Sequence, residues 1–351
     1  MQPPPQRTLL RIIDANLNRA SEALRVAEDV CRFHWGLRGF SEELKRLRHA
    51  VLAAGCPDAA ERARLLEARD ASGDVGREIA SPTEAVSAET LAFRNIERAK
   101  EALRALEEAL RIVRKEAASA IESARYRLYE VEKGLSVFQR GGALKNRLER
   151  VHICLLATTA MARQPLEAVV RDAVAAGVGM VQLREKESGD RRLLDLARSL
   201  RELTASAGAL LIVNDRPDIA SLAAADGVHV GQEDLSVAEA RRIVGPEALV
   251  GVSTHSVEQA LAAQRDGADY VGAGPVFATT TKDAGPLLGL EGLRRVVDTI
   301  DVPVFAIGGI TAANAAQVRA TGAARVAVAS TVLGAARPAE QVESIAAALR
   351  P

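Results

Sequence analysis

Three side chains with hydrogen-bond donors occur at every second position after an apolar segment. They are Gln182, Arg184 and Lys186, within the sequence QLREK. Residues at this spacing in a β-strand point to the same side, so we expect the amide and the two cations to converge. Asn214 ends the next apolar segment and adds a further amide. A solvated strand end is the alternative, but polar residues at other strand ends favour an anion-binding site.

Two aspartates follow the third and fourth apolar segments. Asp215 stands in NDR, and Asp234 stands in HVGQEDL. Mg²⁺ usually binds one or two carboxylates and takes its remaining ligands from phosphate and water. The pair therefore predicts a site for a metal ion and a diphosphate. Each aspartate could instead cap the helix that is expected to follow it.

Hydroxyls, glycine and one more cation occur in three later loops. Thr279, Thr281 and Lys282 follow the sixth apolar segment. Gly309 follows the seventh segment and Ser330 follows the eighth, and both precede expected helices. Glycine lets the backbone approach an anion, and the free N–H groups at the start of a helix bind phosphate. These loops therefore predict a phosphate ligand.

The elements that would position these residues begin near residue 151. Short segments rich in Val, Ile and Leu alternate with helical patterns, as expected of buried parallel strands joined by helical crossovers. The segments VHICLLA, GMVQLRE, ALLIVND, DGVHVG, LVGVST, YVGAGPVF, PVFAIGG and RVAVAS start at 151, 179, 209, 226, 249, 270, 303 and 325. Eight such units predict an α/β fold, a (β/α)₈ TIM barrel with its site at the carboxyl ends of the strands. A doubly wound open sheet is the alternative.

The chain before the barrel has an all-helical pattern that contains an internal duplication. NLNRASEALRVAED, starting at Asn16, is repeated as NIERAKEALRALEE, starting at Asn95. The repeat predicts two amphipathic helices that pack together. The shared Asn16, Asn95, Arg19 and Arg98 are less easily explained as helix surface, so they are candidates for capping or binding.

Changes in sequence pattern divide the chain into two predicted domains and a linker. We predict an all-α domain at 1–140, a basic linker with glycines at 141–150 and the TIM barrel at 151–351. A barrel buries its own strands, so residues from about 146 onward should fold and react without the helical domain.

Composition argues against several classes of protein. Lys plus Arg and Asp plus Glu both total 46, so no net charge attracts the chain to nucleic acid or to an anionic membrane. The three cysteines lack the spacing of a disulfide framework or a zinc site. No apolar segment is long enough to suggest a membrane helix. We expect a cytoplasmic enzyme of small-molecule substrates, with homo-oligomer formation left open.

The order and spacing of the barrel motifs resemble the thiamine phosphate synthase family over roughly residues 148–350. The matching motifs are QLREK, NDR, HVGQEDL, GVSTHS, GPVFATTTK, AIGGI and VAVAS. The resemblance implies condensation of 4-amino-2-methyl-5-hydroxymethylpyrimidine diphosphate with hydroxyethylthiazole phosphate. The products would be thiamine phosphate and pyrophosphate, and Mg²⁺ would be the cofactor.

The resemblance also implies a role for each candidate residue. The diphosphate would contact Gln182, Arg184, Lys186, Asn214 and Lys282, and Mg²⁺ would bind Asp215 and Asp234. The charges of Arg184, Lys186 and Lys282 would stabilise the leaving diphosphate, which makes these residues catalytic. The pyrimidine or the thiazole phosphate would contact Ser253, Thr279, Thr281, Gly309 and Ser330. One departure is Ala278, where the family often has proline.

Two other functions compete with this interpretation. A thiazole tautomerase has a similar barrel, and its proton transfer would make His255 the leading residue. The cations and carboxylates of the predicted diphosphate site have no purpose in such an isomerase. The synthase reaction needs no general base and gives neither His229 nor His255 an obvious catalytic role. A sensor without catalytic activity is the second alternative, with the helical domain as its partner-binding module.

The helical domain resembles the ThiD2 family, which is fused to some thiamine phosphate synthases. The matching stretches are RIIDANLNRASEALRVAEDVCRF and DASGDVGREI, with a candidate loop at residues 70–76. The resemblance implies phosphorylation of hydroxymethylpyrimidine phosphate. However, the sequence has no GxxxxGK[ST] phosphate loop, so an interaction domain is an equal alternative.

Overall fold

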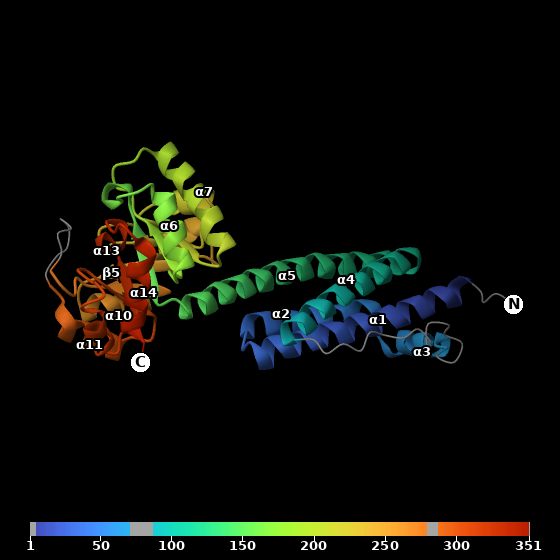
Figure 1. Cartoon of the computed structure of the whole chain (residues 1–351). Helices are drawn as coiled ribbons and strands as arrows, with labels where there is room; N and C mark the ends of the chain where they lie inside the picture. Colours follow the sequence, from blue (N-terminus) through green and yellow to red (C-terminus); the bar gives the residue numbers. More distant parts are fainter. Residues whose placement is uncertain (1–4, 71–86, 279–286, 351) are drawn as a thin grey trace. The chain divides into compact units, whose positions relative to one another are not determined.

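A computed structural model describes residues 5–70, 87–278 and 287–350, and it divides the chain into two compact units, Met1–Val137 and Phe138–Pro351 (Figure 1). Each unit has its own hydrophobic core. Within the described ranges, no helix is long and apolar enough to cross a membrane.

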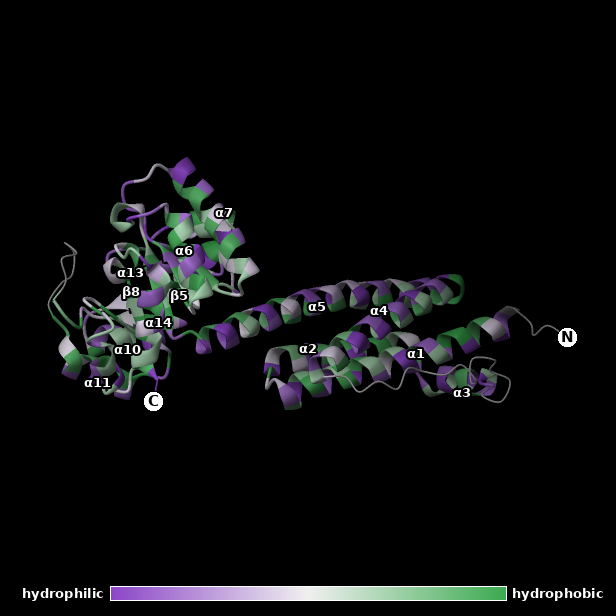
Figure 2. Cartoon of the chain, viewed as in Figure 1, coloured by the Kyte–Doolittle hydropathy of each residue, from purple (hydrophilic) through white to green (hydrophobic). Residues whose placement is uncertain are grey.

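The first unit is all-helical, as the sequence predicts. Its elements are α1 (Pro5–Asp29), the short π-helix η1 (Val30–His34), α2 (Arg38–Gly55), α3 (Ala59–Ala68), α4 (Ala88–Val113) and the first part of α5 (Lys115–Glu149). The side chains of Asp58 and Ser87 cap α3 and α4 by accepting N–H groups of their first turns. Figure 2 shows hydrophobic and hydrophilic residues alternating along α4 and α5, as expected of helices that bury one face.

The duplicated segments lie in α1 and α4, which pack against each other in this core. Asn16 and Asn95 lie inside these helices rather than at their caps. The Nδ2 atom of each donates to the carbonyl oxygen four residues earlier, at 2.9 Å for Asn16 and 2.8 Å for Asn95. Arg19 and Arg98 are exposed. Both amides therefore form hydrogen bonds within their own helices.

The duplication also repeats a buried ion pair. Glu28 and Glu107 occupy equivalent positions of α1 and α4, and both are buried. Glu28 pairs with Arg48 of α2 at 3.1 Å, and Glu107 pairs with Arg125 of α5 at 3.0 Å. Because a buried carboxylate without a partner is costly, each pair ties a duplicated helix to the helix that follows it.

The second unit contains a closed barrel of parallel strands in the order β1 to β8. The strands are β1 (Ile153–Ala157), β2 (Met180–Leu183), β3 (Leu210–Asn214), β4 (Gly227–Val230), β5 (Leu249–Thr254), β6 (Tyr270–Ala273), β7 (Val304–Ile307) and β8 (Arg325–Val328). Each predicted strand is present. The predicted barrel is thus confirmed, and the doubly wound alternative is wrong because β1 pairs with β8.

Helices alternate with these strands along the chain. They are α6 (Leu166–Ala175), α7 (Asp190–Ser206), α8 (Pro217–Leu222), α9 (Val237–Val244), α10 (Val257–Arg265), α11 (Gly289–Thr299), α12 (Ala315–Arg319), α13 (Ser330–Leu333) and α14 (Pro338–Leu349), with a 3₁₀ turn, η3 (Thr159–Met161), after β1. Ser236 opens α9 with a capping box, in which its side chain and that of Glu239 bond each other's backbone N–H groups.

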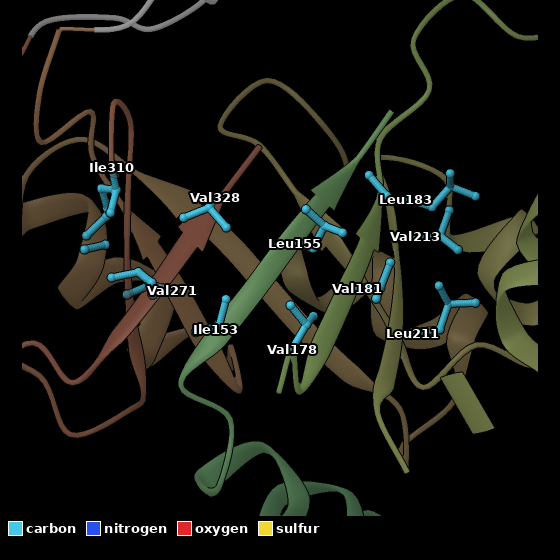
Figure 3. Close-up of a cluster of buried hydrophobic side chains, with 14 of the residues drawn as sticks. Ile153, Leu155, Val178, Val181, Leu183, Leu211, Val213, Val271, Ile310 and Val328 are labelled. Carbon is cyan, nitrogen blue, oxygen red and sulfur yellow. The ribbon is translucent and has the colours of Figure 1, made fainter. Parts of the chain in front are cut away.

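Alternate residues of each strand face opposite sides of the barrel wall. Ile153 and Leu155 of β1 and Val181 and Leu183 of β2 belong to the large cluster between strands and helices, part of which Figure 3 shows. The residues between them form an inner cluster, which includes Cys154, Met180, Leu210, Ile212, Leu249, Tyr270, Phe305 and Ala327. Polar residues continue this inner row at the carboxyl ends of the strands, so the pleat itself gathers the site.

The last turns of α5 close the opposite end of the barrel. Leu144 and Leu148 belong to the inner cluster, which also contains Leu210 and Leu249, the first residues of β3 and β5. Ion pairs join this helix to the strand starts, Arg147 with Asp226 at 3.3 Å and Lys145 with Asp269 at 2.9 Å. Residues 141–149, predicted as a linker, are therefore helical. The reason is that leucines four residues apart share one helix face, on which Leu148 is buried and Leu144 is half-buried.

We predict that Leu148→Ala destabilises the barrel by about 2–5 kcal/mol, because Leu148 is 1% exposed and its loss leaves a cavity under the strands. The measurement is denaturant unfolding of the full chain. The only tryptophan, Trp35, lies in the helical unit, so its fluorescence follows that unit while circular dichroism also follows the barrel.

Asn146→Ala is the matched control, since Asn146 is exposed on the same helical turn. A barrel transition that is equal in Leu148→Ala and in the control would show that α5 is a linker here.

Candidate active site

A cavity of about 430 Å³ opens at the carboxyl ends of the strands. Of the predicted site residues, six line it, namely Gln182, Arg184, Asn214, Ser253, Gly309 and Ser330. They come from five different strands or the loops after them, and closure of the barrel brings them together. The size suits a ligand larger than a single phosphate ion.

The cationic side of the site follows β2. The backbone N–H of Arg184 donates to the carbonyl oxygen of Ala157 at 2.8 Å, which extends the pairing of β1 and β2 by one residue. The next residue, Glu185, accepts the N–H of Thr159 at 2.5 Å and its hydroxyl at 3.0 Å. These bonds fix Glu185, which stands between the cations Arg184 and Lys186. Lys186 is exposed.

Asp215 and Asp234 approach each other beside these cations. Burial and a hydrogen bond with Asp234 raise the pKa of Asp215 to about 6, while the charges of Lys186 and Arg184 oppose the shift. The raised pKa reflects an unfavourable interaction between two carboxylates at a partly buried position. A bound divalent cation would reduce that interaction. Asp234 is held by the backbone N–H of Gly231, which donates to its Oδ2 at 2.7 Å.

The donor set at this position fits Mg²⁺. Asp215 adopts a positive φ of 61°, and its N–H donates to the carbonyl oxygen of His229 at 2.8 Å. This conformation is unusual for a residue with a side chain, and here it accompanies the turn that brings Asp215 to Asp234. No cluster of three or more potential protein ligands occurs among the described residues. A site with two carboxylates leaves positions for phosphate and water, as Mg²⁺ requires.

The loops after β7 and β8 form the opposite wall of the cavity. Gly308 and Gly309 both have positive φ, and a Cβ at Gly309 would lie 2.6 Å from the carbonyl oxygen of Ala278. Asn314 holds this turn, because it donates to the Gly309 carbonyl at 2.9 Å and accepts the Thr311 N–H at 2.8 Å. Glycine is thus required here by both conformation and space.

Three of the predicted residues come after β6 in the sequence, and one comes after β8. Ser330 is the first residue of α13 and lines the cavity, as does Ala278. Thr279, Thr281 and Lys282 lie outside the described residues.

The floor of the cavity contains two residues that are absent from the predicted site, His229 and Tyr270. His229 Nε2 lies 2.9 Å from Ser253 Oγ, and its Nδ1 lies 3.2 Å from the Tyr270 hydroxyl. Burial lowers the pKa of His229 to about 4 and raises that of Tyr270 well above its usual value, so both are neutral. The available signal was the strand pattern, because His229 occupies an inward position of β4.

His255 also lines the cavity, after β5. Its Nδ1 donates to the carbonyl oxygen of Gly274 at 2.6 Å, and its backbone N–H donates to Gln259 Oε1 at 2.7 Å. These two bonds hold the loop after β5 against the end of β6.

Comparison with known proteins matches each half of the chain to a protein family. Residues 153–332 match the family model described as thiamine monophosphate synthase, and residues 11–134 match the ThiD2 family. A thiamine-phosphate synthase from Gloeobacter violaceus is 42% identical over 95% of this chain and 94% of its own length. Another from Rhodopirellula baltica is 39% identical over 92% of this chain and 88% of its own.

A solved structure supports the assignment of the barrel. The thiamine phosphate pyrophosphorylase from Pyrococcus furiosus is 37% identical, with a TM-score of 0.54 over 59% of this chain and 97% of its own. The match of both halves to near full-length relatives agrees with the resemblance inferred from the motifs. The chain therefore belongs to the thiamine monophosphate synthase family.

Proposed function

We propose that the barrel condenses 4-amino-2-methyl-5-hydroxymethylpyrimidine diphosphate with hydroxyethylthiazole phosphate to form thiamine phosphate and pyrophosphate. The observation that carries this proposal is the juxtaposition in one region of a carboxylate pair, Asp215 and Asp234, with the cations Arg184 and Lys186. Two carboxylates beside two cations suit a diphosphate that is bound through a metal ion. Family membership supports the same reaction.

We assign Asp215 and Asp234 as the residues that would hold Mg²⁺. When bound there, Mg²⁺ would neutralise charge on the diphosphate and favour its departure. Arg184 and Lys186 supply positive charge from the other side, where negative charge grows as the carbon–oxygen bond breaks. Gln182 and Asn214 orient the ligand through amide donors and acceptors.

The remaining contacts divide between the two substrates. We propose Lys282 as a third cation at the diphosphate, and Ser253, Thr279, Thr281, Gly309 and Ser330 as contacts of the pyrimidine or the thiazole phosphate. The turn at Gly309 supports an anion contact at the cavity wall, because a backbone without a side chain lets an anion approach closely. The thiazole nitrogen attacks the methylene carbon, and the reaction needs no protein base.

For the helical unit we propose a role that is separate from the chemistry in the barrel. Phosphorylation of the pyrimidine phosphate and a purely interacting role are the two candidates. The buried ion pairs Glu28–Arg48 and Glu107–Arg125 have a structural role in this unit. They therefore favour neither the kinase role nor the interaction role. Assay of the unit with pyrimidine phosphate and ATP distinguishes them.

We predict that Asp215→Asn and Asp234→Asn each reduce kcat/KM by about 10² or more, because each removes a charged ligand of the metal ion. Glu233→Gln is the matched control, since Glu233 is an exposed neighbour of Asp234. Steady-state kinetics at saturating Mg²⁺ gives the comparison. Wild-type rates in EDTA-treated enzyme without added metal would contradict the Mg²⁺ proposal.

A second prediction separates the synthase from a tautomerase. His255→Asn should lower kcat by less than about tenfold, because in the synthase His255 only holds a loop through Gly274. A tautomerase that used His255 for proton transfer would lose about 10² or more. Turnover of the two phosphorylated substrates is measured beside thiazole isomerisation. Near-complete loss of synthase turnover would give His255 a chemical role and overturn the assignment.

A further inference from the structure

Arg216 immediately follows Asp215, a proposed ligand of the metal ion, and its side chain joins the starts of two helices. Its guanidinium donates from Nε and Nη2 to the two carboxylate oxygens of Asp218, at 2.9 and 2.7 Å. Its Nη1 donates to Asp190 Oδ1 at 2.7 Å. Asp218 lies in the first turn of α8, and Asp190 is the first residue of α7. We call these three side chains, Arg216, Asp218 and Asp190, the loop clamp.

Each of the two helices follows a loop of the proposed site. Helix α7 follows the loop after β2, which carries Arg184 and Lys186, and α8 follows the turn after β3, which carries Asp215. The proposed cations and this carboxylate therefore belong to two separate loops. The bond between Arg216 and Asp190 joins the far ends of these loops, so it restricts how one loop moves against the other.

The backbone at Asp215 requires support from its surroundings. Its φ of 61° is unfavourable for a residue with a side chain, and such conformations persist only where neighbouring contacts hold them. Before this residue, the N–H of Asp215 donates to the carbonyl oxygen of His229 at 2.8 Å. After it, the carbonyl oxygen of Arg216 accepts the N–H of Ala220 at 3.0 Å, and the guanidinium adds the loop clamp. Arg216 thus fixes the direction in which the chain leaves Asp215.

The position of Arg216 is not that of a ligand-binding cation. Within the described ranges, the residues that line the cavity include Arg184 but not Arg216. Two carboxylates already surround the charge of Arg216, and the two-bond contact with Asp218 sets the plane of the guanidinium. A cation paired in this way attracts a distant anion only weakly, because the opposite charges nearly cancel.

We propose that Arg216 is a positioning residue that holds Asp215 in place relative to the two cations of the neighbouring loop. The proposal rests on the proposed function, because it takes Asp215 and Asp234 as the ligands of Mg²⁺. Residues that orient metal ligands change the metal affinity when they are replaced, although they do not touch the metal. Arg216 therefore contributes to the affinity for a metal-bound diphosphate through Asp215.

Binding of magnesium pyrophosphate separates positioning from a simple effect of charge. Isothermal titration calorimetry of the full chain with Mg²⁺ and pyrophosphate gives the dissociation constant without any turnover. Asp190→Asn removes a negative charge, so Coulomb forces alone would tighten binding of this anionic complex. The loop clamp predicts the opposite sign, and we expect binding to weaken by about threefold. The Asp190 side chain is 78% exposed, so we expect this variant to fold.

Two further variants control for charge. Asp195→Asn is the matched control, since Asp195 is another exposed aspartate of α7 and the change of charge is the same. Arg216→Lys retains the positive charge but cannot hold two carboxylates in one planar fork, so we expect it to weaken binding by about threefold or more. Binding to Asp190→Asn that is as tight as binding to Asp195→Asn would overturn the proposal. Thermal unfolding followed by circular dichroism establishes that each variant is folded.

A double-mutant cycle tests whether Arg216 and Asp190 act together. We expect Arg216→Gln to weaken binding by about tenfold or more, and the addition of Asp190→Asn to change it little, because its partner is already lost. Equal effects of Asp190→Asn in both backgrounds would contradict the loop clamp. Asp215→Asn tests the proposed function separately. If this variant binds magnesium pyrophosphate as tightly as the unmodified chain, the proposed metal site is wrong, and the role of Arg216 is wrong with it.

Discussion

Pairing of β1 with β8 closes the sheet, and the geometry of the active site depends on this closure. Ile153, Cys154 and Leu155 lie opposite Val326, Ala327 and Val328, so the first and last strands share the same parallel register as the other neighbours. A closed sheet has an inside, and the two-residue period of each strand then places every second side chain in it. The inner row is apolar at the base and polar at the carboxyl ends.

The site combines opposite charges, and the fold shields them in part from bulk water. Burial and the neighbouring Asp234 raise the pKa of Asp215, while the charges of Lys186 and Arg184 oppose this shift. In the proposed function, neither pair alone would bind a metal diphosphate, because the carboxylates would hold the metal and the cations would hold the phosphate oxygens. The cost of holding two carboxylates together is met by the barrel, which positions both at adjacent strand ends.

Sequence patterns predicted the parts of the structure that depend on local spacing. The strands and the inward side chains at their ends follow from alternation, which is why Gln182, Arg184 and Asn214 were found to share one cavity. The helical character of residues 141–149 depends on burial of Leu144 and Leu148 by strands that are remote in sequence. The Tyr270 and His229 contact likewise requires knowledge of which strands are neighbours, so spacing along one strand does not reveal it.

We propose that the barrel, with the end of α5 as its base, contains the whole synthase site. Steady-state kinetics of purified residues 138–351 beside the full chain tests it most directly, because this fragment retains Leu144, Leu148 and every proposed ligand. We predict a folded fragment whose kcat and KM for both substrates lie within about threefold of those of the full chain. A folded fragment without activity would contradict it and would show that the helical unit completes the site.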